Sequence, residues 1–412
     1  MDDGLSRFRS DAGLSDHAQS VIDTTRQLVA DVIGPNASEL DRSDPPRFPT
    51  ENFEAIRDAG LLGLCIPKEH GGLGAGLNGD LRLYYQVLEE LAAGCPSTSQ
   101  LFGVHCISIF KFEALATQEQ QARFYAEVLE EGATFASLGS EPRVSVLHAN
   151  TMDTAGKRDG DTWTFSGKKN FGTGSAGFRY AILLTLGEGS DTLSGGLLQV
   201  VVPLDADGVE ITENWNPMGQ RSTCSYDVTL TNVEIDDGNV IGGPGDFFDH
   251  PILGQTFQLT FAAVYVGMAR GAVQATVSYA MNKSRPWVGL DSVGQDPYIT
   301  YHMANSDIGA RASALLMHEA AWTQEQAVAG NMSWEESAAA TYRARVASGE
   351  AAIDAGNRLF EVCGARATAR SQGVDHWYRD ARTLTLHDSL DRRREVLGKY
   401  VLGYEGPKAG II

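Results

Sequence analysis

Apolar residues recur at helical spacing through the first third of the chain. Between residues 80 and 93, three leucines and a tyrosine fall on one face, because positions three and four apart are neighbours on an α-helix. This pattern predicts a helical N-terminal domain at residues 1–133. Three further segments carry the same period: 28–33, 53–62 and 97–115.

The hydrophobic period changes from helical to alternating near residue 134. Short alternating runs are separated by turns rich in Gly and Asp, such as Arg-Asp-Gly-Asp at 158–161. Short strands at close spacing are typical of a small antiparallel barrel or sandwich, which we expect at residues 134–243. The predicted strands lie at 134–140, 163–167, 180–186, 197–203 and 226–235.

A Gly-Gly-Pro-Gly linker at 242–245 precedes a return to the helical pattern. Long Ala-rich runs with short connections are typical of an antiparallel four-helix bundle, which we expect at residues 244–412. The chain is therefore predicted to be an α+β protein with a helical N-terminal domain, a small middle β-domain and a C-terminal bundle. The four predicted bundle helices cover 253–283, 301–330, 335–363 and 389–403.

The net charge of −20, from 53 acidic and 33 basic residues, excludes some classes of partner. Nucleic acids and anionic membranes attract the opposite sign, so we expect neither as a partner. Any bound phosphate needs locally placed Arg or Lys. The longest apolar run, at 261–273, contains Arg270 and is shorter than the roughly 20 apolar residues that span a bilayer.

Five scattered cysteines predict neither a disulfide framework nor a metal site, because none forms a CxxC pair or shows metal-ligand spacing. An odd, scattered count fits the reducing cytosol, and we expect each cysteine to be a small buried hydrophobe. The Asp- and Ser-rich start lacks the apolar core of a signal peptide. We therefore expect a cytoplasmic protein.

The segment at 364–388 concentrates candidate chemistry. Three arginines, Arg366, Arg370 and Arg379, lie close together in an otherwise acidic chain, and such a cluster needs a negatively charged partner. Downstream, His387 and Asp388 place a titratable ring beside a carboxylate. This order suggests phosphate binding by the first part and proton chemistry by the second.

The same segment resembles the C-terminal part of the acyl-CoA dehydrogenase superfamily. The resemblance rests on the Arg-Asp-Ala triplet at 379–381 and an acidic residue nine positions after Arg379. In the dehydrogenases that acidic residue is a catalytic Glu in a Tyr-Glu-Gly setting, whereas this chain reads His387-Asp388-Ser389. The departure resembles the flavin-dependent monooxygenase branch of the superfamily.

Two stretches of the middle domain resemble flavin loops of this superfamily. Ser-Leu-Gly-Ser-Glu-Pro at 137–142 is similar to its Thr-Glu-Pro loop, and Gly-Lys-Lys-Asn-Phe-Gly-Thr-Gly at 167–174 is similar to its Gly-x-Lys-x-Trp-Ile-Thr-Asn loop. Ordinary turns between strands are the alternative for each stretch. A flavin ring needs an apolar wall and polar donors at its edge. The resemblance implies these flavin-binding residues: Leu138, Ser140, Phe171, Thr173, Gly174 and Ser175.

The first connection of the predicted bundle reads Ser-Arg-Pro-Trp at 284–287. Dehydrogenases usually carry Arg-x-Gln-Phe-Gly there, which binds FAD. The resemblance to the monooxygenase branch implies that Arg285 binds the phosphate of FMN, often across a subunit boundary, since a guanidinium suits bidentate phosphate contacts. A surface arginine is the alternative. FMN is preferred, with FAD as the other candidate, and the further residues assigned to the cofactor are Trp287, Arg366 and Arg370.

His105 falls on an apolar helix face with Leu101, Ile109 and Phe112. A histidine in this setting is usually a core residue. Monooxygenases of the resembled branch carry a pocket histidine on this helix, which favours a catalytic role for His105. They often carry an aromatic residue one turn later, and here that position is Ile109.

The resemblance leaves two chemistries to compare. A dehydrogenase needs a general base beside the substrate, but the two known base positions hold Phe257 and Asp388, and an aspartate is one methylene too short. A monooxygenase binds reduced FMN from a separate NAD(P)H-dependent reductase and adds O2 at flavin C4a to give a hydroperoxide. His387 and His105 would hydrogen-bond or protonate it, and Asp388 would set the local electrostatics.

We therefore predict a two-component flavin-dependent monooxygenase acting on a hydrophobic small molecule, with aromatic and organosulfur compounds favoured. An FAD-containing acyl-CoA dehydrogenase with Asp388 as base is the alternative. A scaffold without flavin ranks last, because the candidate arginines and hydroxyl residues are all present. The resemblance also implies a homotetramer.

Overall fold

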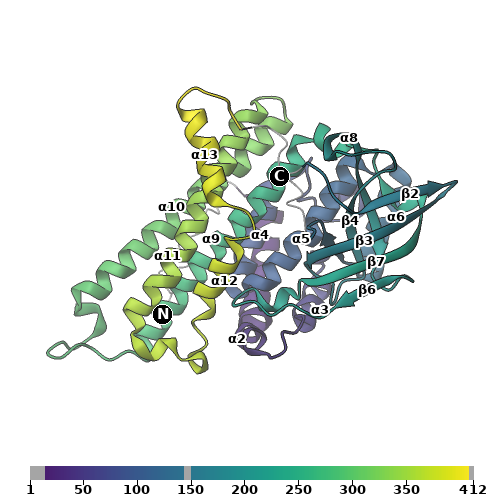
Figure 1. Ribbon diagram of the computed structural model, residues 1–412. Coiled ribbons are helices and arrows are strands. Elements are labelled where there is room, and N and C mark those ends of the chain that lie inside the picture. The colour runs from purple at the N-terminus through teal and green to yellow at the C-terminus, as the bar shows by residue number, and fades with distance from the viewer. Residues whose placement is uncertain (1–13, 143–149, 408–412) are drawn as a thin grey trace.

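The computed structural model describes residues 14–142 and 150–407. In Figure 1 the strands gather at one side, the long helices of the C-terminal part lie at the other, and N-terminal helices lie between them. This arrangement agrees with the predicted α+β architecture. The domain limits at 133/134 and 243/244 stay predictions.

The N-terminal part is helical, and several of its helices begin at predictable caps. The Asp80 side chain accepts from the Leu83 N–H, and Thr117 and Gln120 form a reciprocal capping box. The helices are α1 (Asp16–Leu28), η2 (Val29–Ile33), α2 (Gly34–Arg42), α3 (Thr50–Asp58), η3 (Leu61–Gly63), η4 (Lys68–His70), α4 (Leu81–Gly94), α5 (Pro96–Leu115) and α6 (Gln118–Glu131).

Among the described residues, eight strands form one sheet with the order β6-β7-β3-β2-β4-β5-β8, and β1 pairs with β4. Most neighbours are antiparallel, as predicted, but the β1–β4 and β2–β4 pairs are parallel. The strands are β1 (Phe135–Leu138), β2 (Ala155–Asp159), β3 (Thr162–Gly172), β4 (Tyr180–Leu186), β5 (Leu197–Pro203), β6 (Val209–Thr212), β7 (Tyr226–Asp236) and β8 (Val240–Ile241).

Short helical segments connect the strands and lead into the bundle: α8 (Leu193–Gly196), η5 (Arg221–Thr223), η6 (Asp237–Asn239) and η7 (Asp246–Asp249). The bundle helices and their connections are α9 (Pro251–Asn282), η8 (Val293–Gln295), α10 (Pro297–Val328), α11 (Trp334–Cys363), η9 (Ala365–Thr368), η10 (Arg370–Gln372), α12 (His376–Leu384) and α13 (Leu390–Val401).

Helices α9 and α11 run in the same direction. Ser337 donates to Gln255 at one end (2.6 Å), and the Cys363 Sγ lies 4.0 Å from the Thr276 carbonyl oxygen at the other. By length and composition α9 could cross a membrane, but 94% of its most apolar window is buried inside the protein. All five cysteines are buried and free.

A buried ion-pair network joins the N-terminal helices to the bundle. Arg270 of α9 pairs with Glu89 and Glu90 of α4, and Glu90 also pairs with Arg26 at 2.8 Å. Burial alone would raise the pKa of Glu89, but the charges and hydrogen bonds of Arg270 and His318 together outweigh burial and lower the pKa to about 2. The network therefore consists of charged groups that stabilise one another out of water.

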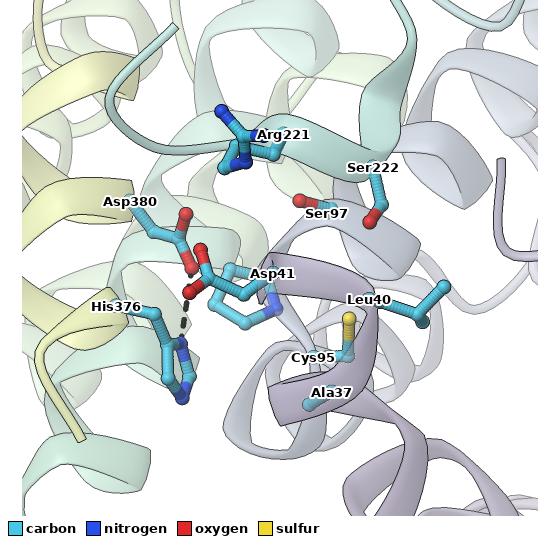
Figure 2. A pocket seen from close by; sticks show the side chains of 10 residues that line it. Ala37, Leu40, Asp41, Cys95, Ser97, Arg221, Ser222, His376 and Asp380 are labelled. Atoms are coloured by element: carbon cyan, nitrogen blue, oxygen red, sulfur yellow. Dashed lines mark hydrogen bonds and ion pairs between the residues drawn. The ribbon is translucent and has the colours of Figure 1, made fainter. Parts of the chain in front are cut away.

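A small pocket lies where α2, α5, η5 and α12 meet (Figure 2). Its polar side chains bond to protein groups: His376 Nδ1 lies 3.2 Å from Asp380, and Arg221 donates to the Ser43 carbonyl at 2.8 Å. Asp380 also accepts from the Gln220 N–H. The Gln220–Asp380 bond fastens the β-domain to α12, the helix that leads to the His387 turn.

Candidate active site

His387 lies in the turn after α12. Its N–H donates to the Leu384 carbonyl at 3.0 Å, and the same carbonyl accepts from the Tyr265 hydroxyl of α9 at 2.9 Å. The imidazole stacks on Phe261, with ring centroids 4.5 Å apart, and lies 5.9 Å from Phe257. The residue itself is exposed, so a polar ring stands on an aromatic wall where a ligand can reach it.

His387 is uncharged near neutral pH. Loss of water on the side of the ring that packs on Phe261, followed by the positive charge of Arg345, lowers the pKa of His387 below its ordinary value, although Asp388 acts in the opposite direction. Water at the exposed edge of the residue opposes the burial effect, but the ordinary value of about 6.5 is already below 7. A neutral imidazole can donate a hydrogen bond from one nitrogen and accept at the other.

Asp388 is held by arginines. Its Oδ2 accepts from Arg393 Nε at 2.9 Å and Nη2 at 2.6 Å, and Arg345 Nη2 lies 3.9 Å away. Burial would raise the pKa of Asp388, but the charges of Arg345 and Arg393 hold it below its ordinary value. A carboxylate paired in this way is a weak general base, because protonating it breaks the ion pair.

The two predicted flavin loops lie side by side in the β-domain. Ser137 and Thr173 form an isolated bridge, and the Asn170 N–H donates to the Ser140 carbonyl at 3.0 Å. The Thr173 hydroxyl lies 3.0 Å from that of Ser225, and Ser140 is exposed. Two segments about 30 residues apart thus present hydroxyl and backbone groups at one place.

Phe171 projects from the second loop. It is 59% exposed, contacts Trp215 edge-to-face at 6.1 Å between centroids, and has a φ of 55°. A bulky residue with positive φ is strained, and such strain gathers at functional sites. An exposed aromatic face beside hydroxyl groups fits the ring of a flavin.

Three further loop residues, Leu138, Gly174 and Ser175, support this surface from the protein interior. Leu138 is fully buried. Gly174 has a φ of 88°, and a Cβ there would lie 2.5 Å from the Phe178 ring, so only glycine fits. The buried Ser175 hydroxyl donates to the Cys224 carbonyl at 3.4 Å, so it supports the loop from inside.

A buried ion pair ties the two loops together. Lys169 is fully buried, and its Nζ lies 2.7 Å from Glu141 Oε1. Glu141 also accepts from the Thr154 N–H at 3.0 Å. Burial lowers the pKa of Lys169 to about 8 despite the opposing charge of Glu141. The pair fixes how far apart the loops lie.

We expect Lys169→Met to weaken FMN binding by about tenfold or more, a loss of roughly 1.4 kcal/mol, because Glu141 loses its cation and the loops separate. Fluorescence titration with FMN measures the change. The matched control is Lys168→Met, since Lys168 is half exposed and pairs with Asp227 at the surface. Equal affinities in the two variants would show that the buried pair does not position the loops.

The predicted phosphate residues lie at the opposite end of the bundle. Arg285 and Trp287 follow α9, and Arg366 and Arg370 follow α11; the ends of these helices meet at Cys363 and Thr276. All four residues are exposed. From Phe261, which contacts His387, to the end of α9 is about 30 Å at 1.5 Å per residue. Within one chain these residues and His387 do not form one site.

Arg379 does not join this arginine group. It pairs with Asp375 at 2.8 Å and donates to Asp41 from Nη1 at 2.8 Å. Its expected anionic partner is therefore within the protein.

His105 lies in the core between α5 and the sheet. It is fully buried, its Nε2 lies 3.0 Å from the Leu62 carbonyl oxygen, and its ring stacks near Phe135. Burial lowers the pKa of His105 to about 4. The contacts of His105 are with Leu62 and Phe135, and its catalytic role stays a prediction.

The chain matches known proteins of the acyl-CoA dehydrogenase superfamily along most of its length. Family models for the N-terminal, middle and C-terminal domains of acyl-CoA dehydrogenase match residues 15–131, 136–233 and 259–392. The probable FMNH2-dependent monooxygenase SfnC of Pseudomonas putida is 30% identical over 89% of this chain and 92% of its own length. The chain belongs to the flavin-dependent monooxygenase branch of the acyl-CoA dehydrogenase superfamily.

Two further relatives belong to the same branch. Dibenzothiophene monooxygenase of Rhodococcus erythropolis is 28% identical over 91% of this chain and 92% of its own length. The FMN and indole complex of TdsC from Paenibacillus sp. A11-2 is similar in structure, with a TM-score of 0.87, 26% identity, and coverage of 95% of this chain and 99% of TdsC. The fold of this flavin monooxygenase is thus established over nearly its whole length.

Sequence reasoning missed four residues of the site. Phe261, Arg345 and Arg393 surround the His387 turn, and Lys169 joins the flavin loops. Arg345 falls at a position of its Ala-rich helix where the neighbouring residues are small or apolar, and this is a signal that could have been followed. The partners of the others come from distant parts of the chain, so spacing alone did not reveal them.

Proposed function

We propose that this protein is a two-component monooxygenase that uses reduced FMN and O2 to oxygenate a hydrophobic small molecule. The observation that carries the proposal is the His387 turn: a neutral histidine stands on Phe257 and Phe261, and the two positions of the dehydrogenase glutamate hold Asp388 and Phe257. Bound reduced flavin supplies the electrons that activate O2. The relatives named for FMNH2-dependent and dibenzothiophene oxygenation support the assignment.

The chain's own residues have separate tasks in this proposal. Phe171 provides an apolar wall for the flavin ring, and Ser140 and Thr173 provide polar contacts at its edge. His387 would donate a hydrogen bond, or a proton, to the oxygen that reacts there. Phe257 and Phe261 keep water away from that oxygen.

The dehydrogenase alternative has little support in this geometry. Phe257 has no acidic group, and Asp388 is engaged by Arg393. Removing a proton from an acyl-CoA would require Asp388 to leave that ion pair and to reach further than its short side chain allows.

The substrate is proposed to be an aromatic or organosulfur compound. Phe257, Phe261 and Phe171 offer apolar surface around the reacting position, and relatives are named for dibenzothiophene or bind indole. The test is incubation with FMN, NADH, a flavin reductase and ¹⁸O2, with dibenzothiophene and indole as probes. Mass spectrometry should find one ¹⁸O atom per product molecule. Unlabelled product, or NADH consumption that yields only hydrogen peroxide with every probe, would contradict the substrate class.

We further propose a separate NAD(P)H-dependent flavin reductase as partner and a cytoplasmic location. SfnC, the 30% identical relative, is named for its use of FMNH2, and an enzyme that receives FMNH2 needs a source of it. The five buried free cysteines suit a reducing compartment.

A homotetramer is proposed from two features. Arg285 can reach a flavin phosphate near His387 only from a neighbouring subunit, given the length of α9. Helix α10 also exposes large apolar residues at intervals of seven, so that they lie along one stripe. This α10 stripe consists of Tyr301, Ile308, Leu315 and Trp322, which are 60%, 64%, 68% and 49% exposed.

The shared-site model predicts complementation between two inactive variants. Arg285→Ala should weaken FMN binding and His387→Ala should abolish oxygen transfer. The whole coexpressed population should regain about a quarter of wild-type activity, because half of random pairs are mixed and one of the two sites in each mixed pair is intact. Differently tagged subunits allow the mixed species to be purified. Activity no higher than the mean of the two parents would place both residues in one subunit's site.

The α10 stripe predicts a specific loss of assembly. Leu315→Glu and Ile308→Glu should convert the oligomer to smaller species, because buried charges without partners oppose association. Light scattering after size exclusion measures the mass. Ser20→Glu, on the exposed face of α1, is the control and should leave the mass unchanged. An unchanged mass in both stripe variants would place the interface elsewhere.

A further inference from the structure

Arg345 is a buried cation with too few partners. It lies in the middle of α11 with no exposed surface, and its Nη1 donates to the Gln258 carbonyl at a long 3.3 Å. Among the described residues, its Nε and Nη2 have no hydrogen-bond acceptor, and the nearest carboxylate oxygen, of Asp388, lies 3.9 Å from Nη2. Burying such a group destabilises a fold unless its hydrogen bonds are satisfied.

The ion pair with Asp388 does not account for Arg345. Asp388 already accepts two hydrogen bonds from Arg393, at 2.9 and 2.6 Å. Arg393 is also placed by the Tyr342 hydroxyl, which accepts from its Nη1 at 3.2 Å. Asp388 would therefore remain paired if Arg345 were absent. Stabilising Asp388 does not explain why a guanidinium group is buried at position 345.

Arg345 does lie next to the wall that supports His387. Its Cζ lies 4.4 Å from the centroid of Phe261, the ring on which His387 stacks at 4.5 Å. It also lies 5.7 Å from the Tyr265 ring, whose hydroxyl binds the carbonyl at the start of the His387 turn. One cation thus contacts both the ring on which the imidazole stacks and the tyrosine that binds the start of the turn.

We propose that Arg345 is a positioning residue that orients His387 through Phe261 and Tyr265, so that the ring can donate a hydrogen bond to the reacting oxygen. Its positive charge adds to the packing that disfavours the protonated ring. The inference rests on the proposed function for its catalytic meaning. Its structural part, a neutral and oriented His387, concerns this chain alone.

The charges around His387 support the direction of the effect. Arg345 on α11 opposes protonation of the ring and Asp388 favours it. Arg393 of α13 pairs with Asp388 and offsets the negative charge of that carboxylate. Among the described residues, Arg345 is then the nearby charge with the largest effect on the His387 ring. Helix α9 contributes Phe257, Phe261 and the neutral Tyr265 on this side. Removing the charge of Arg345 should therefore favour the protonated ring.

The test titrates His387 itself by NMR, without flavin. The protein is labelled at the ring carbon of its nine histidines, and His387→Gln identifies the signal. Arg345→Met should raise the pKa of His387 by at least about one unit, a tenfold gain in proton affinity. Arg345→Lys, which keeps the charge, should shift it by less than half as much. Arg343→Met, at an exposed position of the same helix, should leave it unchanged.

A second uncharged variant protects the test against misfolding. Arg345→Gln can still donate to the Gln258 carbonyl, so it replaces Arg345→Met if that variant does not fold. The same pKa for His387 in wild type and in the folded uncharged variant would overturn the proposal. An equal rise in Arg345→Lys would also overturn it, since the effect would then follow packing and not charge.

The effect of Arg345 on the pKa of His387 and the effect of Arg345 on catalysis can be tested separately. With reduced FMN and O2, the uncharged variant should show flavin reoxidation that accelerates as pH falls through the raised pKa of His387, while wild type does not over the same range. If wild type never oxygenates a substrate, the proposed function fails and the NMR titration still decides the role of Arg345 toward His387. If wild type oxygenates and the titration shows no shift, only the role of Arg345 fails.

Discussion

His387→Ala is expected to lower oxygen transfer to substrate by on the order of 10²–10⁴-fold, the usual contribution of a positioned acid or base. The neutral imidazole on Phe261 is the group placed to donate to oxygen at the flavin. FMN should still bind, because the wall at Phe171 and the flavin loops are separate from the turn. The measurement compares product formed with hydrogen peroxide released per NADH consumed.

The matched control is His70→Gln, since His70 is exposed in the N-terminal part and should leave both yields unchanged. In His387→Ala, NADH should continue to be consumed and nearly all of it should appear as hydrogen peroxide. Product formation within threefold of wild type would show that His387 is not a catalytic residue. His105 would then be the candidate.

Arg270→Ala is expected to lower the free energy of unfolding by about 3–5 kcal/mol, the cost of leaving buried charges without their partner. Arg270 contacts both Glu89 and Glu90, and these side chains are nearly buried. Because the network joins α4 to α9, the loss should appear in the transition that separates the N-terminal helices from the bundle. Urea unfolding followed by tryptophan fluorescence measures it.

Two further variants test whether the loss of stability comes from buried charges without partners. Arg392→Ala removes an exposed pair with Glu395 and should cost at most about 0.5 kcal/mol. Combining Arg270→Met with Glu89→Gln and Glu90→Gln should recover a large part of the loss, because no unpaired charge then stays buried. If Arg270→Ala costs no more than Arg392→Ala, the network does not hold the two parts together.

Local patterns were enough to predict most helices and the long strands. The predicted helix at 80–93 is α4 (Leu81–Gly94), and the predicted strands at 180–186 and 197–203 are β4 and β5. Strands β2, β6 and β8 were missed because they are short and have few buried residues. The parallel pairing of β1 with β4 is non-local, and periodicity carries no information about it.

The site residues, like the elements of the fold, could be predicted only where the signal is local in the sequence. The flavin loops and the His387 turn were predicted because each carries its motif within a few consecutive residues. Arg379 was grouped with phosphate-binding arginines, but its partner Asp41 lies 338 positions earlier in the chain. The Arg345–Phe261–His387 contacts likewise join three separate elements. Pairings of this kind follow from tertiary packing, which sequence spacing does not encode.

The most direct test of the monooxygenase assignment is a stopped-flow experiment. The protein is mixed anaerobically with reduced FMN and then with oxygen, and the flavin spectrum is followed. A transient absorbance distinct from reduced and oxidised FMN, long-lived in wild type and shortened at least about tenfold in His387→Ala, is predicted. Reoxidation as fast as that of free FMN, with protein-bound oxidised flavin bleached by an acyl-CoA, would contradict the assignment and make Asp388 the candidate base.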